Sequence, residues 1–399
     1  MRKYKLFGDE AILTPLAQWI MDENIERLEE ELTSGNLKIN DEFEVTKYIG
    51  ETPLTLALYG NKRKVIDWLL EHKVDLNDSK NPGINMACSS SDIDIIERLI
   101  DMGMKFQNTC SQEYQEPVDQ EFSDSDNHYE EDSDGGYTRE NLKDIDQCIS
   151  KAIYGNRIDV IRLLIKKGYD IKKNGKILRQ AVFNKQYEVI DILIDNGIDV
   201  NFCIPDMVFP YNSTPVHIAT SNNDIELVKK LVNKGADVLI KDEYGCRPFT
   251  CAYEKNLSEL IEYLKGIEPD YLHDKDYLVN ELYKKNYTLP KRLMTIIYNA
   301  NNDKESLTFK TTDENEFVNI IRFHSIITIK EIKFNKLLFL DLLSYTDDYD
   351  NCGFFCWNQA ENCLSHLDFE MGECVNLCTF DEFDSCLDNL GATIDKIFE

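Results

Sequence analysis

Apolar residues recur with the same spacing six times along the first two thirds of the chain. A single alanine marks each unit, and an apolar pair follows eight and nine residues later. In five units a second apolar pair follows after twelve and thirteen residues, so a broad apolar stripe lies along one side of a helix. Each unit therefore predicts two helices, the second of them amphipathic. The marker residues are Ala57, Ala87, Ala152, Ala181, Ala219 and Ala252.

The ends of the predicted helices carry matching signals. Thr214 is of the type that caps a helix N-terminus, and Pro215 suits the first helical position. A glycine stands sixteen residues after four of the alanines, at Gly103, Gly168, Gly197 and Gly235, whereas Lys73 takes this place in one unit. One helix pair cannot bury its stripe alone, so the units are expected to stack into a solenoid.

The best-preserved unit reads Thr214-Pro215-Val216-His217-Ile218-Ala219, and Thr52–Ala57 and Arg247–Ala252 repeat the pattern. This resembles the signature of the ankyrin repeat. The resemblance covers about residues 10–266 and implies about seven repeats, including a degenerate one around Thr14. It also implies that His217 forms hydrogen bonds between repeats and is not a catalytic residue.

Two segments depart from the repeat. Residues 107–142 form an insertion, and no Lys or Arg occurs from Phe106 to Thr138. Such an acidic stretch is expected to be a solvated loop, with an ordered binding arm as the alternative. Phe202–Asn212 is longer than a usual hairpin and carries Phe209 and Tyr211.

The repeat period ends near residue 266, and residues 267–399 predict a separate, smaller α+β domain. Helical spacing occurs at 275–286, 290–300 and 380–398, and strand-like runs occur at 306–310, 326–334, 352–357 and 373–380. The run CGFFCWN, followed by Phe380 and Phe383 at the start of the last helix, resembles the end of SMI1/KNR4-type domains. Many bacterial members of that family are immunity proteins, so the resemblance implies a toxin-neutralising role.

Composition narrows the possible functions. The formal net charge is −29, which opposes binding to nucleic acids and favours basic protein partners. No apolar run approaches the length of a membrane span, and the N-terminus shows no signal-peptide pattern. The 12 cysteines are then expected to be free thiols of a cytoplasmic protein.

The C-terminal cysteines are the main candidates for other chemistry. Cys352/Cys356 and Cys374/Cys378 share a spacing of four, with His366 between them. Buried thiols are the preferred interpretation, and a zinc-binding or enzymatic module guided by the repeats is the alternative. The acidic run 347–353 lacks the closing Glu of a calcium loop. Because nucleotide-binding, hydrolase and zinc-protease motifs are absent, the sequence predicts a protein that is not an enzyme and has neither metal nor cofactor.

The ankyrin resemblance implies which residues contact a partner. In that family, contacts come from the turn before the Thr-Pro pair and from the positions just after the signature alanine. Carried over to this sequence, the expected partner-binding residues are Glu51, Tyr59, Ser89, Ser90, Tyr154, Phe183, Asn184, Ser213, Ser221, Asn222, Glu243, Cys246, Glu254 and Lys255.

Overall fold

The computed structural model divides the chain into two compact units, residues 1–198 and 199–399. The predicted boundary near residue 266 lies within the second of these units, and it stays a prediction as a domain boundary. The predicted acidic insertion at 107–142 lies outside the described residues, which are 4–6, 9–77, 83–106, 147–206, 208–209, 211–300, 306–310, 318–345, 354–368 and 371–389.

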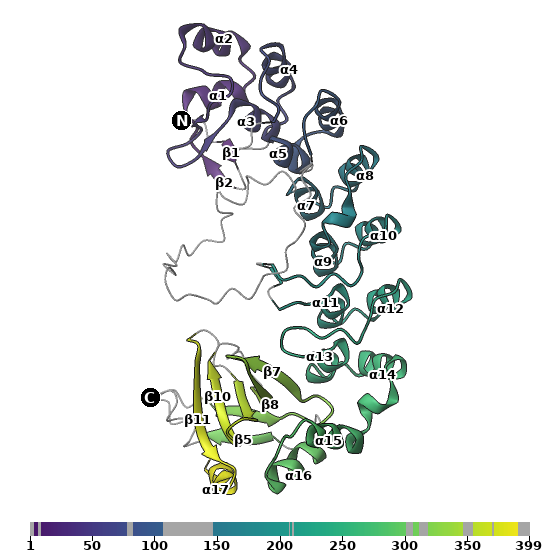
Figure 1. Cartoon of the computed structure of the whole chain (residues 1–399). Coiled ribbons are helices and arrows are strands. Elements are labelled where there is room, and N and C mark those ends of the chain that lie inside the picture. The colour runs from purple at the N-terminus through teal and green to yellow at the C-terminus, as the bar shows by residue number, and fades with distance from the viewer. Residues whose placement is uncertain are drawn as a thin grey trace. The chain divides into compact units, whose positions relative to one another are not determined.

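Unit 1 is a stack of helix pairs (Figure 1). The first helices of successive pairs contact one another, and the second helices do the same. The pairs are α1 (Pro15–Met21) with α2 (Ile25–Ser34), α3 (Pro53–Tyr59) with α4 (Arg63–Glu71), α5 (Gly83–Ser90) with α6 (Ile93–Asp101), α7 (Gln147–Tyr154) with α8 (Ile158–Lys166), and α9 (Lys176–Phe183) with α10 (Tyr187–Asp195). Short elements lie between or before them: β1 (Tyr4–Leu6), β2 (Asp9–Ala11), β3 (Phe43–Glu44), β4 (Gly50–Glu51) and the 3-10 helix η2 (Ile171–Lys173).

The marker alanines explain how closely the first helices stack. Ala57, Ala87, Ala152 and Ala181 are fully buried, and the side chain of alanine is small enough to let neighbouring helices approach. The amide five residues after an alanine donates to its carbonyl oxygen at Ala57, Ala152 and Ala181. In α1 the same bond, from Asn24 to the carbonyl of Trp19, shows that Trp19 takes the alanine position of the first repeat.

Left-handed residues close each helix pair. Gly103, Gly168 and Gly197 have φ angles of 100°, 98° and 83°, which glycine adopts without steric cost. Lys73, the exception in the sequence, adopts the same region with φ of 57°, at a cost of about 1 kcal/mol for a residue with a Cβ.

Unit 2 contains two more helix pairs and a sheet. The pairs are α11 (Pro215–Ser221) with α12 (Ile225–Asn233) and α13 (Pro248–Glu254) with α14 (Ser258–Ile267). The 3-10 helix η3 (Asp270–His273), α15 (Lys275–Lys284) and α16 (Lys291–Asn299) follow, and both predicted helices of this region are present. The strands are β5 (Ser306–Lys310), β6 (Val318–Phe323), β7 (Lys330–Phe334), β8 (Leu337–Tyr345), β9 (Phe354–Asn358), β10 (Cys363–Asp368) and β11 (Glu373–Thr379), and α17 (Phe383–Asp388) comes last.

The strands form one antiparallel sheet in the order β11-β10-β9-β8-β6-β5, with β7 paired to β8. One face packs Phe355, Trp357 and Leu364 against residues of α15, α16 and α17. The other face holds a smaller cluster that includes Ile332, Phe339 and Cys356. The solenoid followed by a smaller α+β region confirms the predicted fold class. Strands β6, β8 and β10 were not predicted, and the strand expected at 326–334 occupies only Lys330–Phe334.

Candidate functional site

The position two residues after the marker alanine forms a row along the first helices of unit 1. Two residues correspond to about 200° of helical rotation, so this position lies on the side opposite the buried alanine. We call these five residues the inner-helix row: Met21, Tyr59, Ser89, Tyr154 and Phe183. Met21 was missed from the sequence because Trp19 replaces the alanine that marks the other repeats.

Tyr154 and Phe183 are the most open members of the row. They end the adjacent helices α7 and α9 and are 66% and 55% exposed. Tyr59, Met21 and Ser89 are half-buried. Two large exposed aromatic rings at equivalent positions of neighbouring helices are the type of anchor that dominates protein interfaces.

Side chains of the following repeat hold the ends of the inner helices. In two repeats the carbonyl one residue before the row position accepts a hydrogen bond from the next repeat: Ser91 Oγ donates to Leu58 O at 2.8 Å, and Gln186 Nε2 donates to Ile153 O at 2.6 Å. Arg157 Nη1 donates to Ser91 O at 2.7 Å and lies 3.5 Å from Cys88 O. The backbone that presents the row is therefore fixed from one repeat to the next.

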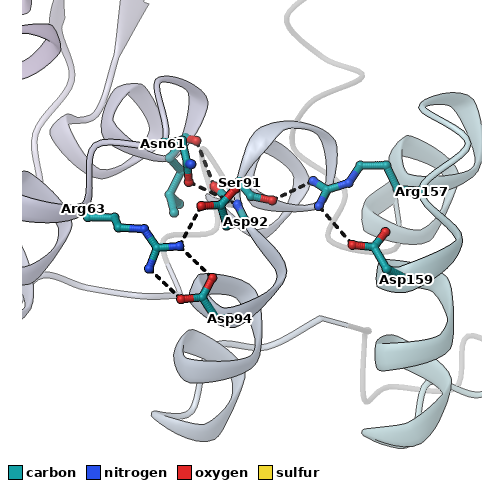
Figure 2. A network of polar contacts seen from close by, with 8 residues as sticks. Asn61, Arg63, Ser91, Asp92, Asp94, Arg157 and Asp159 are labelled. Carbon is teal, nitrogen blue, oxygen red and sulfur yellow. Dashed lines mark hydrogen bonds and ion pairs between the residues drawn. The ribbon is translucent and has the colours of Figure 1, made fainter.

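The bonds of Arg157 connect the repeats on either side of the predicted insertion. Figure 2 shows its guanidinium between the carbonyl of Ser91 and the carboxylate of Asp159, which is 3.5 Å away. Helices α5 and α7 also contact each other directly, and Cys148 Sγ donates to Phe106 O at 2.9 Å. The stack thus continues from α5 to α7 through contacts between described residues.

A second part of this network joins the two preceding repeats. Arg63 lies 2.6 Å from Asp92 and 2.5 Å from Asp94, and Asn61 Oδ1 accepts the backbone N–H of Asp92 (Figure 2). The hydrogen bonds from Asn61 and Arg63 lower the pKa of Asp92, and the bond from Arg63 lowers that of Asp94. Because these groups are exposed, their role is to fix repeat geometry more than to add stability.

The structure corrects two of the predicted contact residues. Glu51 is 6% exposed and Cys246 is 8% exposed, so neither side chain presents a surface to a partner. Both belong to the turn before a first helix, and this turn packs against the stack instead of projecting from it. Of the remaining predicted residues, Tyr154, Phe183, Asn184, Ser221, Glu243, Glu254 and Lys255 are exposed, whereas Tyr59, Ser89, Ser90, Ser213 and Asn222 are half-buried.

The predicted residues are divided between the two units. Unit 1 brings together Tyr59, Ser89, Ser90, Tyr154, Phe183 and Asn184 on successive inner helices. Unit 2 holds Ser213, Ser221, Asn222, Glu243, Glu254 and Lys255.

In the last repeat of unit 2, the residue at the row position contacts another part of the same chain. Glu254, two residues after Ala252, lies 2.8 Å from Lys330 of β7. Lys330 is also 3.8 Å from Asp341 of β8, and His324 lies 3.3 Å from the same carboxylate. Burial alone would lower the pKa of Lys330, but the negative groups around it, led by Glu254, raise it well above the ordinary value. Glu254 therefore helps to attach the sheet to the repeat.

The signature histidine has the role that the resemblance implies. His217 Nδ1 lies 2.8 Å from Thr214 Oγ1, and His217 Nε2 lies 3.0 Å from the carbonyl oxygen of Cys246 in the next repeat. Burial lowers the pKa of His217 to about 4. This histidine is a neutral structural group that joins two repeats.

The C-terminal cysteines do not come together as their spacing suggested. Cys374 pairs with Leu367 and Cys378 with Leu364, and a register shift after Leu364 places the two thiols on opposite faces of the sheet. Cys378 packs in the helix-covered core, whereas Cys374 is exposed. Within the described ranges no group of three metal-ligating side chains occurs. Cys352 and the acidic run 347–353 lie outside the described residues.

Among the described residues, none of the helices combines the length and the apolar character that crossing a bilayer requires.

Comparison with known proteins places the repeats in a family. The family model described as ankyrin repeat matches residues 49–81 and 211–243, which are the two repeats that combine a Thr-Pro pair with the marker alanine. An ankyrin repeat protein of Rickettsia felis is 36% identical over 101 residues, covering 23% of this chain and 26% of the relative. Alpha-latrocrustotoxin-Lt1a of Latrodectus tredecimguttatus is 29% identical over 174 residues, covering 43% of this chain.

The chain spans only 11% of that toxin's length and about a quarter of the Rickettsia protein.

Two solved structures are also similar. The ankyrin repeat domain of Bcl-3 is 19% identical with a TM-score of 0.41, covering 63% of this chain and 100% of the domain. The human ASB11 ankyrin repeat domain is 16% identical with a TM-score of 0.44, covering 64% of this chain and 100% of the domain.

Proposed function

Because this chain is an ankyrin-repeat protein, we propose that it is a non-enzymatic binding protein whose inner-helix row in unit 1 contacts a protein partner. Ankyrin repeats indicate a protein–protein interaction domain, and the exposure of Tyr154 and Phe183 is the observation that selects this part of it. Their rings are 66% and 55% exposed, and a hydrogen bond from Gln186 of the next repeat holds the end of the helix that carries Tyr154. Rigid aromatic anchors lose little conformational entropy on binding.

The partner in this proposal is a basic protein. The formal net charge of −29 produces a negative potential that accelerates encounter with positive surfaces. An inhibitor of a basic nuclease or toxin, acting like an immunity or anti-defence protein in the cytoplasm, is the specific form of the proposal. The resemblance of the last 50 or so residues to SMI1/KNR4-type domains is compatible with that form and remains a prediction.

A zinc-binding or enzymatic C-terminal module is the alternative. The described cysteines do not favour it, because Cys374 and Cys378 lie on opposite faces of the sheet. Metal analysis of the purified full chain tests the alternative directly: stoichiometric zinc would revive it.

The proposal predicts that Tyr154→Ala with Phe183→Ala abolishes partner capture. Loss of two central aromatic anchors costs about 2–4 kcal/mol of binding free energy, or about 30- to 1000-fold in Kd. Affinity capture with mass spectrometry identifies proteins that the wild type retains at about 50 mM salt and releases at high salt. Titration calorimetry then measures their affinity for both forms.

A matched control separates the row from exposed aromatics in general. Tyr271→Ala removes a tyrosine that is 48% exposed in η3 of unit 2, so this variant is expected to bind like the wild type. Circular dichroism and melting of the double variant should be unchanged, because both rings are exposed. Wild-type affinity in the double variant would rule out the inner-helix row as the binding surface, and a partner with an acidic interface would rule out charge complementarity.

A further inference from the structure

Strand β11 ends the sheet of unit 2. Within the part of the chain that the structure describes, β11 pairs with β10 and the order of strands stops there. Figure 1 shows it as the outermost strand of the sheet. An edge strand presents backbone N–H and C=O groups that a further strand can use.

The first half of β11 is open on both faces. Side chains of a strand point alternately to the two faces, and Glu373, Cys374, Val375 and Asn376 are all exposed. The second half is anchored, because Leu377 and Cys378 pack against the core beneath α17. The register shift after Leu364 lies between these halves. An anchored strand with an open half offers a fixed template four residues long.

This edge lacks several of the features that usually prevent pairing. Natural edge strands are protected by Lys, by Pro or by being very short. Strand β11 has seven residues, and its sequence ECVNLCT contains neither Lys nor Pro. The register shift is the one device of this kind in it, and it lies beyond the open half.

The charge around the edge indicates which kind of segment can pair with it. No Lys or Arg occurs from residue 337 to residue 395. Glu361 contacts Asn376 of β11 through a hydrogen bond, Glu373 begins the strand, and Asp381 and Glu382 follow its end. Two copies of such an edge would place like charges opposite each other, which opposes pairing of the chain with itself. A basic segment would instead gain favourable contacts on either side.

We propose that the open half of β11 is a strand-addition site for an extended basic segment of a partner protein. The segment supplies main-chain hydrogen bonds to the edge, and its Lys or Arg side chains face Glu361, Glu373 and the acidic turn after the strand. This site lies in unit 2 and is independent of the inner-helix row.

A labelled synthetic peptide tests the site on the full chain. The probe has about nine residues of alternating lysine and valine, which is within the usual range of strand lengths, and fluorescence anisotropy measures its affinity. We expect salt-sensitive binding and slower hydrogen exchange of the amides of residues 373–376. A peptide of the same pattern with glutamate in place of lysine is expected not to bind.

Two kinds of variant separate strand addition from simple charge attraction. Val375→Lys places a cation on the open half, where Val375 is 43% exposed, and is expected to weaken binding at least about tenfold. The matched control is Leu239→Lys, which adds the same charge at a loop residue that is 39% exposed in the same unit. Peptides N-methylated on odd or on even amides complete the set, because only one of the two blocks the pairing edge.

Each result of these binding experiments either supports or overturns strand addition at β11. Loss of binding by Val375→Lys and by one methylated peptide, with Leu239→Lys unchanged, supports the proposal. Equal binding of both methylated peptides, protection elsewhere than residues 373–376, or no binding of the lysine peptide overturns it. The variant with Tyr154→Ala and Phe183→Ala is expected to bind this peptide normally, so failure of the two sites can be told apart.

Discussion

His217 makes the stability of unit 2 depend on pH in a defined direction. The carbonyl oxygen of Cys246 accepts, so Nε2 must donate to it, and Nδ1 then accepts from the backbone N–H of Thr214 at 3.3 Å. This arrangement needs the neutral imidazole with its proton on Nε2. A second proton on Nδ1 would place a charge in a buried site and take away the acceptor of the Thr214 N–H, so the fold resists protonation.

The pKa gives the size of the effect. The pKa of His217 is lowered from 6.5 to about 4, with burial as the main cause. Between these pH values the unfolded chain binds more protons than the native chain. The contribution of this group is therefore complete above pH 6.5 and is lost as the pH falls toward 4, with a limit of about 3 kcal/mol.

The variant His217→Gln tests this reasoning. Glutamine at the third helical position can still bond to the backbone of the capping residue, but it does not titrate. Urea unfolding at several pH values between about 7.5 and 4.5 should show the wild type losing 2–3 kcal/mol more than the variant over this range. Hydrogen exchange in α11 should show the same difference.

Glu268 and His273 also titrate in this unit, with pKa values of about 7 and about 4. Wild type and variant share both groups, so the difference between the two proteins isolates His217. Parallel curves of stability against pH would refute the assigned tautomer and its buried, neutral state.

Two further predictions concern single bonds within each unit. Arg157→Ala should destabilise unit 1 by about 1–3 kcal/mol in urea unfolding, because it leaves the carbonyl of Ser91 without its donor; Arg162→Ala, which removes an exposed ion pair, should cost less than about 1 kcal/mol. Lys330→Met should destabilise unit 2 by about 3–5 kcal/mol and speed hydrogen exchange in β7 and β8, because Asp341 is 1% exposed and would remain buried without its cation. Equal losses for the two arginine variants, or a loss below about 1 kcal/mol for Lys330→Met, would contradict these assignments.

The repeats could be predicted because each depends on local signals. The alanine must be small, the pairs after it must be apolar, and the closing glycine must adopt positive φ, so the same residue types recur at the same spacing. A further local signal exists: the turn within four of the pairs uses a left-handed asparagine, Asn61 and Asn156 in unit 1 and Asn223 and Asn256 in unit 2. Asparagine tolerates this conformation better than most residues.

The sheet was harder to predict because its central strands have no polar face. In β8, Phe339, Leu340, Asp341 and Leu342 are all buried, since helices cover one face and the smaller cluster covers the other. The alternation that reveals a strand disappears in such a run. The register shift in β11 likewise arises from pairing with β10, and the spacing of Cys374 and Cys378 alone did not predict it.

The candidate site could also be predicted only in part, because some of its contacts depend on long-range packing. The ankyrin resemblance, carried over by register, placed the positions just after each alanine on the contact face, and Tyr154, Phe183 and Glu254 are exposed there. Register could not show that Glu254 pairs with Lys330, 76 residues later in the sequence, because that contact depends on how β7 packs on the last repeat.

The contact has a consequence for where a partner can bind. Lys330 reaches the row position of the last repeat with a buried ammonium group, as a basic residue of a partner would, and Tyr244 of the same repeat lies 5.3 Å from the ring of Phe354. Lys330 of the chain itself thus takes the place at the last repeat that a partner residue would take. An external partner would have to displace an ion pair whose ammonium group is buried, whereas at Tyr154 and Phe183 it would cover rings that are already more than half exposed. The energetic difference favours unit 1 as the site of partner contact through the repeats.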